Sequence, residues 1–408
     1  MYCLFDDSSY FEFLPLTYTR PLYALRCGIL TFAERWEKVL AQPIDTLSYD
    51  YLASLWTHVH SPAASHWLNG RIVPNDDLLR LIASAEPDTF YVNDRDEVLI
   101  AHCANRKPAT QTGIFDAHDF EEAGLRKVRL TLAPLTVRTL PDLFLLNAQL
   151  IQYDYALLTY GRRSAPITDP HTRVYGADNI FVEEGVDIKA ATLNAENGVM
   201  YFGYGSTIQE GAILHGTHAL CDHATVNMGA KMRGDTTVGP FSKVGGEVAN
   251  SVIMGYSNKG HDGYLGNSII GYWCNLGADT NTSNLKNNYA NVKLWNYAQE
   301  KQVDTGLQFC GLIMGDHSKC GINTMFNTGT VVGVGANIYG GGFPATHLPS
   351  FAWGGAEGLM THRFEKMLET AHTVTARRKI VISEAEITIL QAIYRLSAPY
   401  RAAFSNQQ

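Results

Sequence analysis

The sequence predicts an α/β domain followed by a single-stranded parallel β-helix and C-terminal helices. Apolar residues six apart recur without a slip at eight positions: Phe202, Ile208, Leu214, Leu220, Val226, Met232, Val238 and Val244. A second run has the same spacing: Met314, Cys320, Phe326, Val332 and Ile338. This period is too short for a helical repeat, and it fits one short strand plus a corner. Three such units close a triangular coil whose inward residues stack on the next coil.

Residues 1–165 mix helix and strand signals, which predicts the α/β domain. A helix is expected over residues 28–41, because Thr31 and Glu34 form a capping box before an apolar face. Short apolar runs at residues 90–92, 98–101 and 128–132 predict strands.

The β-helix is expected over residues 166–353 and the C-terminal helices over residues 354–408. The six-residue spacing disappears between Asn281 and Asp304, which predicts a loop insertion at about 281–304. Apolar residues at helical spacing from Met360 to Ala371, and a capping box of Ser383 and Glu386, predict two helices. Such helices commonly cover the open end of a coil, where unpaired strand edges would otherwise promote aggregation.

Composition excludes several classes of partner. The 408 residues carry a formal net charge of -8, which argues against nucleic acid because that partner requires a basic surface. No stretch reaches the ~18 apolar residues of a membrane span, and the N-terminus does not read as a signal peptide. We therefore expect a cytoplasmic protein without a membrane partner. The seven cysteines form no CxxC pair, so reduced and mostly buried thiols are expected.

Three histidines in the repeat, His215, His218 and His223, resemble a metal-binding set. In a coil of three six-residue units, however, residues close together in sequence lie on different faces, and only residues one full coil apart stack. His215 should stack on Arg233, and His223 on Phe241. We therefore predict no metal site in the repeat.

Two motifs stand where the six-residue register is lost after Val244. Residues 258–266 read NKGHDGYLG, and residues 275–284 read NLGADTNTSN. These strings resemble the acetyltransferase half of the bifunctional UDP-N-acetylglucosamine diphosphorylase/glucosamine-1-phosphate N-acetyltransferase (GlmU-like) family. The leader LPLTYTRPLYALRCG resembles that of an alternate, Bacteroidetes-type branch. The resemblance implies a nucleotidyltransferase-like N-terminal domain and a left-handed β-helix. It also implies acetyl transfer from acetyl-CoA to an amino sugar or sugar phosphate, in sugar-nucleotide and cell-envelope precursor synthesis.

The resemblance assigns roles to residues of these motifs. His261 matches the catalytic base, which takes a proton from the attacking acceptor. Tyr264 matches a tyrosine that contacts the sugar, and Asn284 matches an asparagine near the acyl donor. The alternatives are a corner histidine bonded to backbone, and an ordinary ladder asparagine.

Lys286 and Lys293 lie in the expected insertion, where loops of the family cover a groove for coenzyme A. Their ammonium groups can contact phosphate oxygens, although exposed surface lysines are the alternative. In the family, a neighbouring subunit completes this groove, which implies a homotrimer.

One departure from the family concerns the acceptor phosphate. The family has basic residues after GPF and again before the histidine, whereas here GPFSKVGGEVANS offers only Lys243, with Ala249 at the later position. Either Lys231, Arg233 or Lys259 substitutes, or the acceptor is not a sugar 1-phosphate. The candidate acceptor ligands are therefore Tyr264, Lys259, Lys243, Asn275 and Asn284.

The N-terminal domain lacks the glycine-rich GxGTR loop of nucleotidyltransferases and has FDDSSYFEFLPLTYTRPLYALR instead. Arg20 and Arg26 are candidates to neutralise phosphate charge, while Asp94, with Asp6 or Asp7, and Asn147 are candidates to hold Mg²⁺. A degenerate domain kept for packing is the alternative. Two other functions also remain open: a sugar-1-phosphate nucleotidyltransferase with an inert, oligomerising β-helix, and a non-catalytic sugar-nucleotide-binding scaffold.

Overall fold

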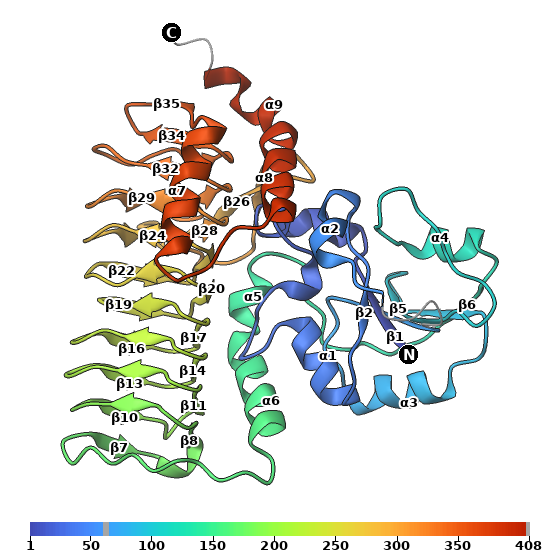
Figure 1. Cartoon of the computed structure of the whole chain (residues 1–408), viewed down its shortest axis with the longest axis horizontal. Coiled ribbons are helices and arrows are strands. Elements are labelled where there is room, and N and C mark those ends of the chain that lie inside the picture. The colour runs from blue at the N-terminus through green and yellow to red at the C-terminus, as the bar shows by residue number, and fades with distance from the viewer. Residues whose placement is uncertain (60–64, 405–408) are drawn as a thin grey trace. The chain divides into compact units, whose positions relative to one another are not determined.

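A computed structural model describes residues 1–59 and 65–404 of the chain. Two compact units are present (Figure 1): unit 1 comprises Met1–Leu25 and Leu30–Leu140, and unit 2 comprises Arg26–Ile29 and Pro141–Gln408. The predicted fold class is confirmed, because unit 1 mixes helices with a sheet and unit 2 is a parallel β-helix with helices at its C-terminal end. Within the described residues, no helix is long and apolar enough to cross a membrane.

Unit 1 is built on a six-stranded sheet with the order β2-β1-β3-β5-β4-β6. Its strands are β1 (Tyr2–Phe5), β2 (Asp45–Thr46), β3 (His66–Asn69), β4 (Thr89–Val92), β5 (Val98–His102) and β6 (Arg126–Arg129). Strand β5 runs antiparallel to β3 and β4, and the other pairs are parallel. The strand expected at 128–132 therefore begins and ends earlier.

Short helices accompany this sheet: α1 (Phe32–Leu40), α2 (Ala53–Trp56), α3 (Asp76–Ser84) and α4 (Ala117–Glu122). The predicted capping box is present at α1, where the Thr31 side chain accepts from the Glu34 amide and Glu34 accepts from the Thr31 amide. The helix begins at Phe32 and not at residue 28, because Thr31 in extended conformation is its N-cap.

A buried charge cluster joins the strands of unit 1. Arg71 is 2% exposed, and its guanidinium donates to Asp7 at 2.8 Å and to Glu97 at 3.1 Å. Glu97 also accepts from Arg138 at 2.9 Å, and Asn69 donates to Asp7 at 2.8 Å. Each buried charge is thus paired and hydrogen-bonded, as burial in a low-dielectric interior requires.

Unit 2 begins with α5 (Asp142–Leu145) and α6 (Asn147–Thr159), and α6 contacts strands β14 (His218–Leu220) and β17 (Thr236–Val238) of the β-helix. The first spatial unit therefore ends near Leu140, whereas the sequence boundary was expected near residue 165. The segment Arg26–Ile29 also belongs to unit 2, where the Thr237 hydroxyl donates to the Gly28 carbonyl at 3.0 Å.

The β-helix has three faces, and the strands within each face run parallel except β35 (Gly358–Thr361), which runs antiparallel to β34 (Ala352–Gly355). Face one contains β7 (Arg173–Tyr175), β10 (Thr192–Asn194), β13 (Ile213–His215), β16 (Lys231–Arg233), β19 (Glu247–Ala249) and β22 (Tyr264–Gly266), beside which lie β25 (Asn281–Thr282) and its partner β30 (Met325–Phe326). Face two contains β8 (Ile180–Val182), β11 (Met200–Phe202), β14, β17, β20 (Val252–Gly255), β23 (Ile269–Tyr272), β28 (Ile313–Met314), β31 (Val331–Val332) and β33 (His347–Leu348). Face three contains β9 (Asp187–Ile188), β12 (Thr207–Ile208), β15 (Thr225–Val226), β18 (Lys243–Val244), β21 (Asn258–Lys259), β24 (Asn275–Leu276), β29 (Lys319–Cys320), β32 (Asn337–Ile338), β34 (Ala352–Gly355) and β35 (Gly358–Thr361).

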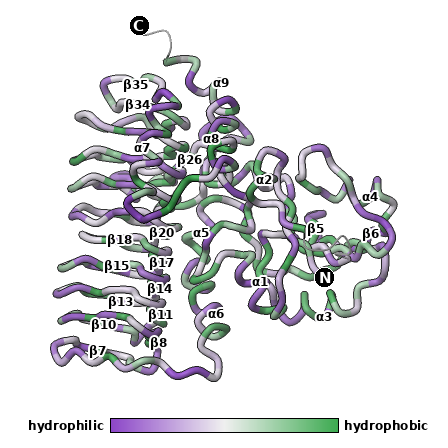
Figure 2. Tube along the Cα trace, in the orientation of Figure 1, coloured by the Kyte–Doolittle hydropathy of each residue, from purple (hydrophilic) through white to green (hydrophobic). Residues whose placement is uncertain are grey.

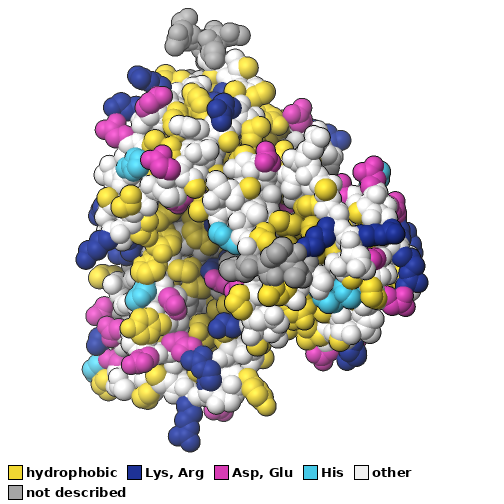
Figure 3. Space-filling view, turned by 45° about the vertical axis from the view of Figure 1, so that its right-hand side comes forward, with side chains coloured by type: hydrophobic (Ala, Val, Ile, Leu, Met, Phe, Trp, Pro, Cys, Tyr) yellow, Lys and Arg dark blue, Asp and Glu magenta, His cyan; other side chains and the backbone are white. Residues whose placement is uncertain are grey.

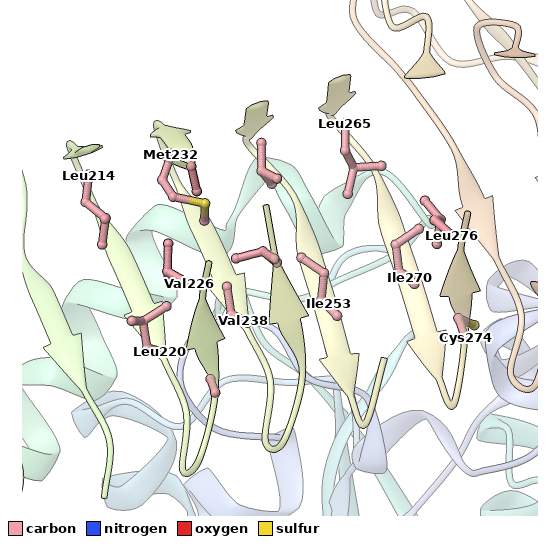
Figure 4. Packing of buried hydrophobic residues seen from close by; sticks show 14 of the residues in the cluster. Leu214, Leu220, Val226, Met232, Val238, Ile253, Leu265, Ile270, Cys274 and Leu276 are labelled. Atoms are coloured by element: carbon pink, nitrogen blue, oxygen red, sulfur yellow. The ribbon is translucent and has the colours of Figure 1, made fainter. Parts of the chain in front are cut away.

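The predicted inward residues form the core of this β-helix. All eight apolar residues of the first run are fully buried, and those of the second run are at most 5% exposed. Figure 4 shows Leu214 and Met232, Leu220 and Val238, and Val226 pointing into the same interior from the three faces. Figure 2 shows hydrophobic and hydrophilic stretches alternating within the coils. The burial of these apolar side chains away from water stabilises the stacking of each coil on the next.

The loss of six-residue spacing after Val244 does not end the coil. On face two, His218 pairs with Thr236 across a full-length coil. The next steps on this face are shorter, because Thr237 pairs with Val252, and Val252 pairs with Ile269. Shortened coils thus keep the three faces in register.

The stacking predicted for the histidines of the repeat is confirmed. His215 pairs with Arg233 in the next coil, and the His223 ring stacks on Phe241 at 4.7 Å.

The expected insertion is present but longer than predicted. Strand β25 still belongs to the coil, and the coil resumes at β28, so residues 283–312 form the insertion. It contains an antiparallel hairpin of β26 (Lys293–Asn296) and β27 (Lys301–Asp304).

The C-terminal helices are α7 (Phe364–Ala376), α8 (Glu384–Leu396) and α9 (Ala398–Arg401). The capping box predicted at Ser383 and Glu386 is present at the start of α8. Met360, which was placed in the first helix, lies in β35, because the chain makes one more antiparallel hairpin before α7 begins.

Candidate functional site

His261 lies in a short turn that joins faces three and one of the β-helix. We call residues 260–263, between β21 and β22, the His261 turn. The Lys259 ammonium donates to the carbonyls of Gly245 at 3.0 Å, His261 at 2.6 Å and Asp262 at 3.2 Å. The Asn227 amide donates to the Gly260 carbonyl at 2.7 Å. Four side-chain hydrogen bonds therefore hold the backbone near an exposed imidazole.

Glycine is required at the end of this turn. Gly263 has φ +108°, and a Cβ there would lie 2.1 Å from the Thr280 carbonyl oxygen. No side chain fits this approach to the next coil. In the HDG sequence, His261 is therefore exposed on the turn, and Gly263 allows the chain to enter β22.

Tyr264 and Asn284 meet on face one. The Asn284 amide donates to the Tyr264 hydroxyl at 3.0 Å and to Asn267 Oδ1 at 2.8 Å. Gly266 makes room for this contact, because a Cβ there would lie 2.2 Å from the Tyr264 hydroxyl. Burial raises the pKa of Tyr264, so its hydroxyl remains a donor for a bound ligand.

Charged side chains extend the Tyr264 surface along face one. Glu247 occupies the strand position beside Tyr264, and Lys231 the position beside Glu247. Arg233 makes a 2.9 Å ion pair with Glu247, and both side chains are at least one-third exposed. Lys231 and Arg233 therefore lie on the same face as Tyr264. A residue that substitutes for the basic residue of the family, which is Ala249 here, would need this position.

The other candidate acceptor ligands separate from this face. Lys243, Asn258 and Asn275 occupy successive strand positions on face three, and Asn258 donates to Asn275 at 3.0 Å. Lys259 is 3% exposed and occupies the inward position beside Val244. Its ammonium is bonded to backbone inside the coil, so we do not propose it as an acceptor ligand.

Lys286 and Lys293 both lie in the insertion of residues 283–312, which also contains Asn284. The Lys286 ammonium donates to the Asn291 carbonyl at 2.7 Å, which braces the insertion. Lys293 begins the hairpin strand β26 and is exposed. Only Lys286 is close in sequence to the Tyr264–Asn284 pair.

The candidate phosphate ligands of the N-terminal region fall in different units. Arg20, in unit 1, is 8% exposed and lies 5.8 Å from the ring centroid of Trp56. Arg26, in unit 2, is 5% exposed and donates to the Ile29 carbonyl. Strand β1 leads into a 3-10 helix, Ser8–Phe13, and not into a glycine-rich loop. Residues 8–13 therefore do not form the glycine-rich loop whose backbone amides cradle a triphosphate in nucleotidyltransferases.

The candidate Mg²⁺ ligands are divided between the two units. Asp94 is exposed in the turn between β4 and β5, in unit 1. Asn147 is fully buried in unit 2, where its oxygen accepts from the Gly28 amide at 2.8 Å and from the Thr237 hydroxyl at 3.0 Å. Its amide group donates to the Asp235 carbonyl at 2.9 Å. Across residues 1–59 and 65–404, no group of three His, Cys, Asp or Glu residues could hold a metal ion.

Asp6, at the end of β1, is buried with one oxygen accepting from the Leu22 amide at 2.9 Å. Burial raises its pKa from 3.8 to about 8. The folded state therefore binds this proton more tightly than the unfolded state, so stability falls as pH rises from about 4 to about 8. We expect Asp6→Asn to flatten this decline in denaturant titrations of the full chain. An unchanged slope would show that Asp6 is ionised in the folded protein at neutral pH.

Comparison with known proteins bears on both parts of the chain. Residues 2–163 match a family model described as sugar nucleotidyl transferase. The chain is 40% identical over 87 residues to the bifunctional protein GlmU of Methanocaldococcus jannaschii, covering 21% of each chain. It is 29% identical over 162 residues to a bifunctional sugar-1-phosphate nucleotidylyltransferase/acetyltransferase of Sulfurisphaera tokodaii, covering 39% of this chain and 38% of that protein.

Among solved structures, the polySia-specific acetyltransferase NeuO aligns with 17% identity and a TM-score of 0.27, over 47% of this chain and 84% of NeuO. The matches to the curated relatives confirm the resemblance inferred from the motifs. The chain spans only about a fifth to two-fifths of the length of those two relatives. The family model extends to the end of α6, beyond the spatial limit of unit 1.

Proposed function

We propose that the chain is an acetyltransferase that moves an acetyl group from acetyl-CoA to an amino sugar or sugar phosphate, in the synthesis of sugar-nucleotide precursors. The observation that carries this proposal is the His261 turn. It presents an exposed imidazole three residues before Tyr264, the hydrogen-bond partner of Asn284, and four side-chain hydrogen bonds fix the surrounding backbone. Because the backbone that carries His261 is fixed, the base starts from a defined position, which lowers the cost of orienting it toward an acceptor.

The reaction assigns a task to each of these groups. The acceptor nitrogen or oxygen attacks the thioester carbonyl carbon, and His261 takes the proton that the acceptor loses. The carbon–sulfur bond then breaks, and the thiolate of coenzyme A leaves and receives a proton. Tyr264 and Asn284 offer a hydroxyl and an amide to the acceptor or the acyl group, while Lys231 and Arg233 attract an acceptor phosphate.

Release of the coenzyme A thiol tests this function directly. The full chain is incubated with acetyl-CoA and with glucosamine 1-phosphate, glucosamine 6-phosphate or glucosamine, and free thiol is titrated over time. We expect thiol release that depends on the acceptor and gives an acetylated product by mass spectrometry. Absence of turnover with every acceptor would contradict the proposal.

Nucleotidyl transfer is the second candidate, because residues 2–163 match the sugar nucleotidyl transferase model. We place it second, since the segment after β1 is a 3-10 helix and the buried Asn147 amide is already bonded to Gly28, Thr237 and Asp235. Pyrophosphate release from UTP and N-acetylglucosamine 1-phosphate in the presence of Mg²⁺ measures it. Release without any turnover of acetyl-CoA would reverse this order.

We further propose a homotrimer with the acyl site between subunits. Large apolar side chains are exposed along the β-helix, at Ile213 and Met325 on face one and at Met228 and Ile322 in the turns after β15 and β29. Burial of such side chains against another chain would favour association. Light scattering at micromolar concentration should give three times the mass of one chain. A monodisperse monomer would contradict this prediction.

A further inference from the structure

A groove on face three, distinct from the Tyr264 surface, lies between the β-helix and helix α7. It has a volume of about 590 Å³ and is lined by the β-helix side chains Lys243 and Lys319 and by Arg377 and Arg378 from the end of α7. Figure 1 shows α7 lying along the upper coils of the β-helix. Both walls belong to unit 2, so a single chain forms the whole groove.

The groove is basic without a compensating acid. Its described lining contains four cationic side chains and no carboxylate, and none of the four makes an ion pair within residues 1–59 and 65–404. On the face visible in Figure 3, by contrast, basic and acidic side chains are interspersed. Cations that converge without a partner repel one another, and an anion between them would remove that repulsion.

Lys319 is the innermost of these cations. Its ammonium donates to the His317 carbonyl at 3.0 Å, and burial lowers its pKa. A bound anion would supply a negative charge beside the Lys319 ammonium and raise its pKa again. A phosphate group, with several acceptor oxygens, suits two arginines and two lysines better than a single carboxylate does.

An aromatic column forms the neighbouring wall. Phe241 stacks on Tyr256 at 5.0 Å, and Tyr256 stacks on Trp273 at 4.4 Å. Tyr256 and Trp273 have φ of 53° and 61°, and both line the groove. Because stacking and the strands of the coils fix these rings, they offer a rigid apolar surface beside the cations.

We propose that this groove binds a nucleoside diphosphate group, with its phosphates against Lys243, Lys319, Arg377 and Arg378 and its base against the Tyr256–Trp273 wall. That group is common to coenzyme A and to a UDP-sugar. Binding here does not require acyl transfer at His261, so each can fail without the other.

The test is isothermal titration calorimetry of the full chain with coenzyme A, UDP and inorganic pyrophosphate. In the variant Arg377→Glu/Arg378→Glu, we expect the affinity for the tighter nucleotide to fall by ~10- to 100-fold. The matched control is Arg363→Glu/Lys379→Glu, which changes the charge equally at residues that flank α7 but do not line the groove. The control should bind within about twofold of the unaltered chain.

Lys243→Gln provides an independent variant on the rigid β18, in case the double variant folds poorly, and it should also weaken binding. Loss of coenzyme A affinity in the groove variants would assign the acyl donor to the groove, and loss of UDP affinity in them would assign a sugar nucleotide. Pyrophosphate as tight as either nucleotide would overturn the nucleoside part of the proposal. Equal affinities in the groove variants and the control would overturn the site.

Discussion

Replacement of His261 by alanine should slow acetyl transfer by ~10² to 10⁴ fold while leaving coenzyme A binding nearly unchanged. The imidazole is exposed, and its turn is held by hydrogen bonds from Lys259 and Asn227 to backbone carbonyls. Removal of the side chain therefore deletes a base without releasing the turn. The rate is measured as acceptor-dependent thiol release, and binding by calorimetry.

His215→Ala is the matched control for this experiment. His215 is another exposed histidine of the β-helix, but it lies on face one and its neighbour in the next coil is Arg233. The free energy of unfolding of each variant should lie within about 0.5 kcal/mol of that of the unaltered chain, because exposed side chains contribute little to stability. A His261→Ala protein that transfers acetyl at the normal rate would eliminate the proposed base.

The β-helix was predictable from sequence because its stability rests on a local period. Each inward position requires only an apolar side chain that can be buried. The six-residue spacing of apolar residues from Phe202 to Val244 therefore indicates the coil directly. The same logic fails after Val244, where shorter coils replace the regular ones and Thr237 pairs with Val252. A coil can lose residues at its corners while its strands still pair with those of the next coil. Corner residues are not apolar at a regular spacing, so the sequence does not show where a coil is shorter.

The motifs identified His261, Tyr264 and Asn284 as candidate site residues, whereas nothing in the sequence indicated their contacts or the groove on face three. Asn275 and Lys319 are neighbours in register although the whole insertion separates them in sequence. Arg377 and Arg378 line the groove because they directly follow α7, which lies against the β-helix. No spacing rule relates these residues to Lys243, because their proximity depends on tertiary packing.

The inward position of Lys259 was also missed, and it has a functional consequence. Its neighbours in the column are Val244 and, across the next pair of strands, Leu276, both apolar and buried. A lysine replaces an aliphatic residue there, and burial lowers its pKa from 10.5 to about 8. Its bonds to the carbonyls of His261 and Asp262 make it a positioning residue for the His261 turn.

Lys259→Met should therefore separate stability from activity. Methionine fills the same inward space without a buried charge, so the free energy of unfolding should stay equal or rise by up to ~2 kcal/mol. Acetyl transfer should nevertheless fall by ~10- to 100-fold in kcat, with little change in KM for acetyl-CoA, because the His261 turn loses its two bonds from the ammonium and the third bond, which ties the ammonium to Gly245, is lost as well. Denaturant titration and steady-state kinetics measure the two quantities.

The pH dependence gives this prediction a second readout that a merely structural lysine would not show. As pH rises through about 8, the Lys259 ammonium loses the proton that lets it donate to all three carbonyls. The unaltered enzyme should lose activity over that interval, whereas Lys259→Met should be slower and nearly flat there. Val244→Met, at the adjacent inward position, controls for the added thioether and should keep the normal profile. If Lys259→Met is less stable and keeps full activity, the lysine serves the fold and not the position of His261.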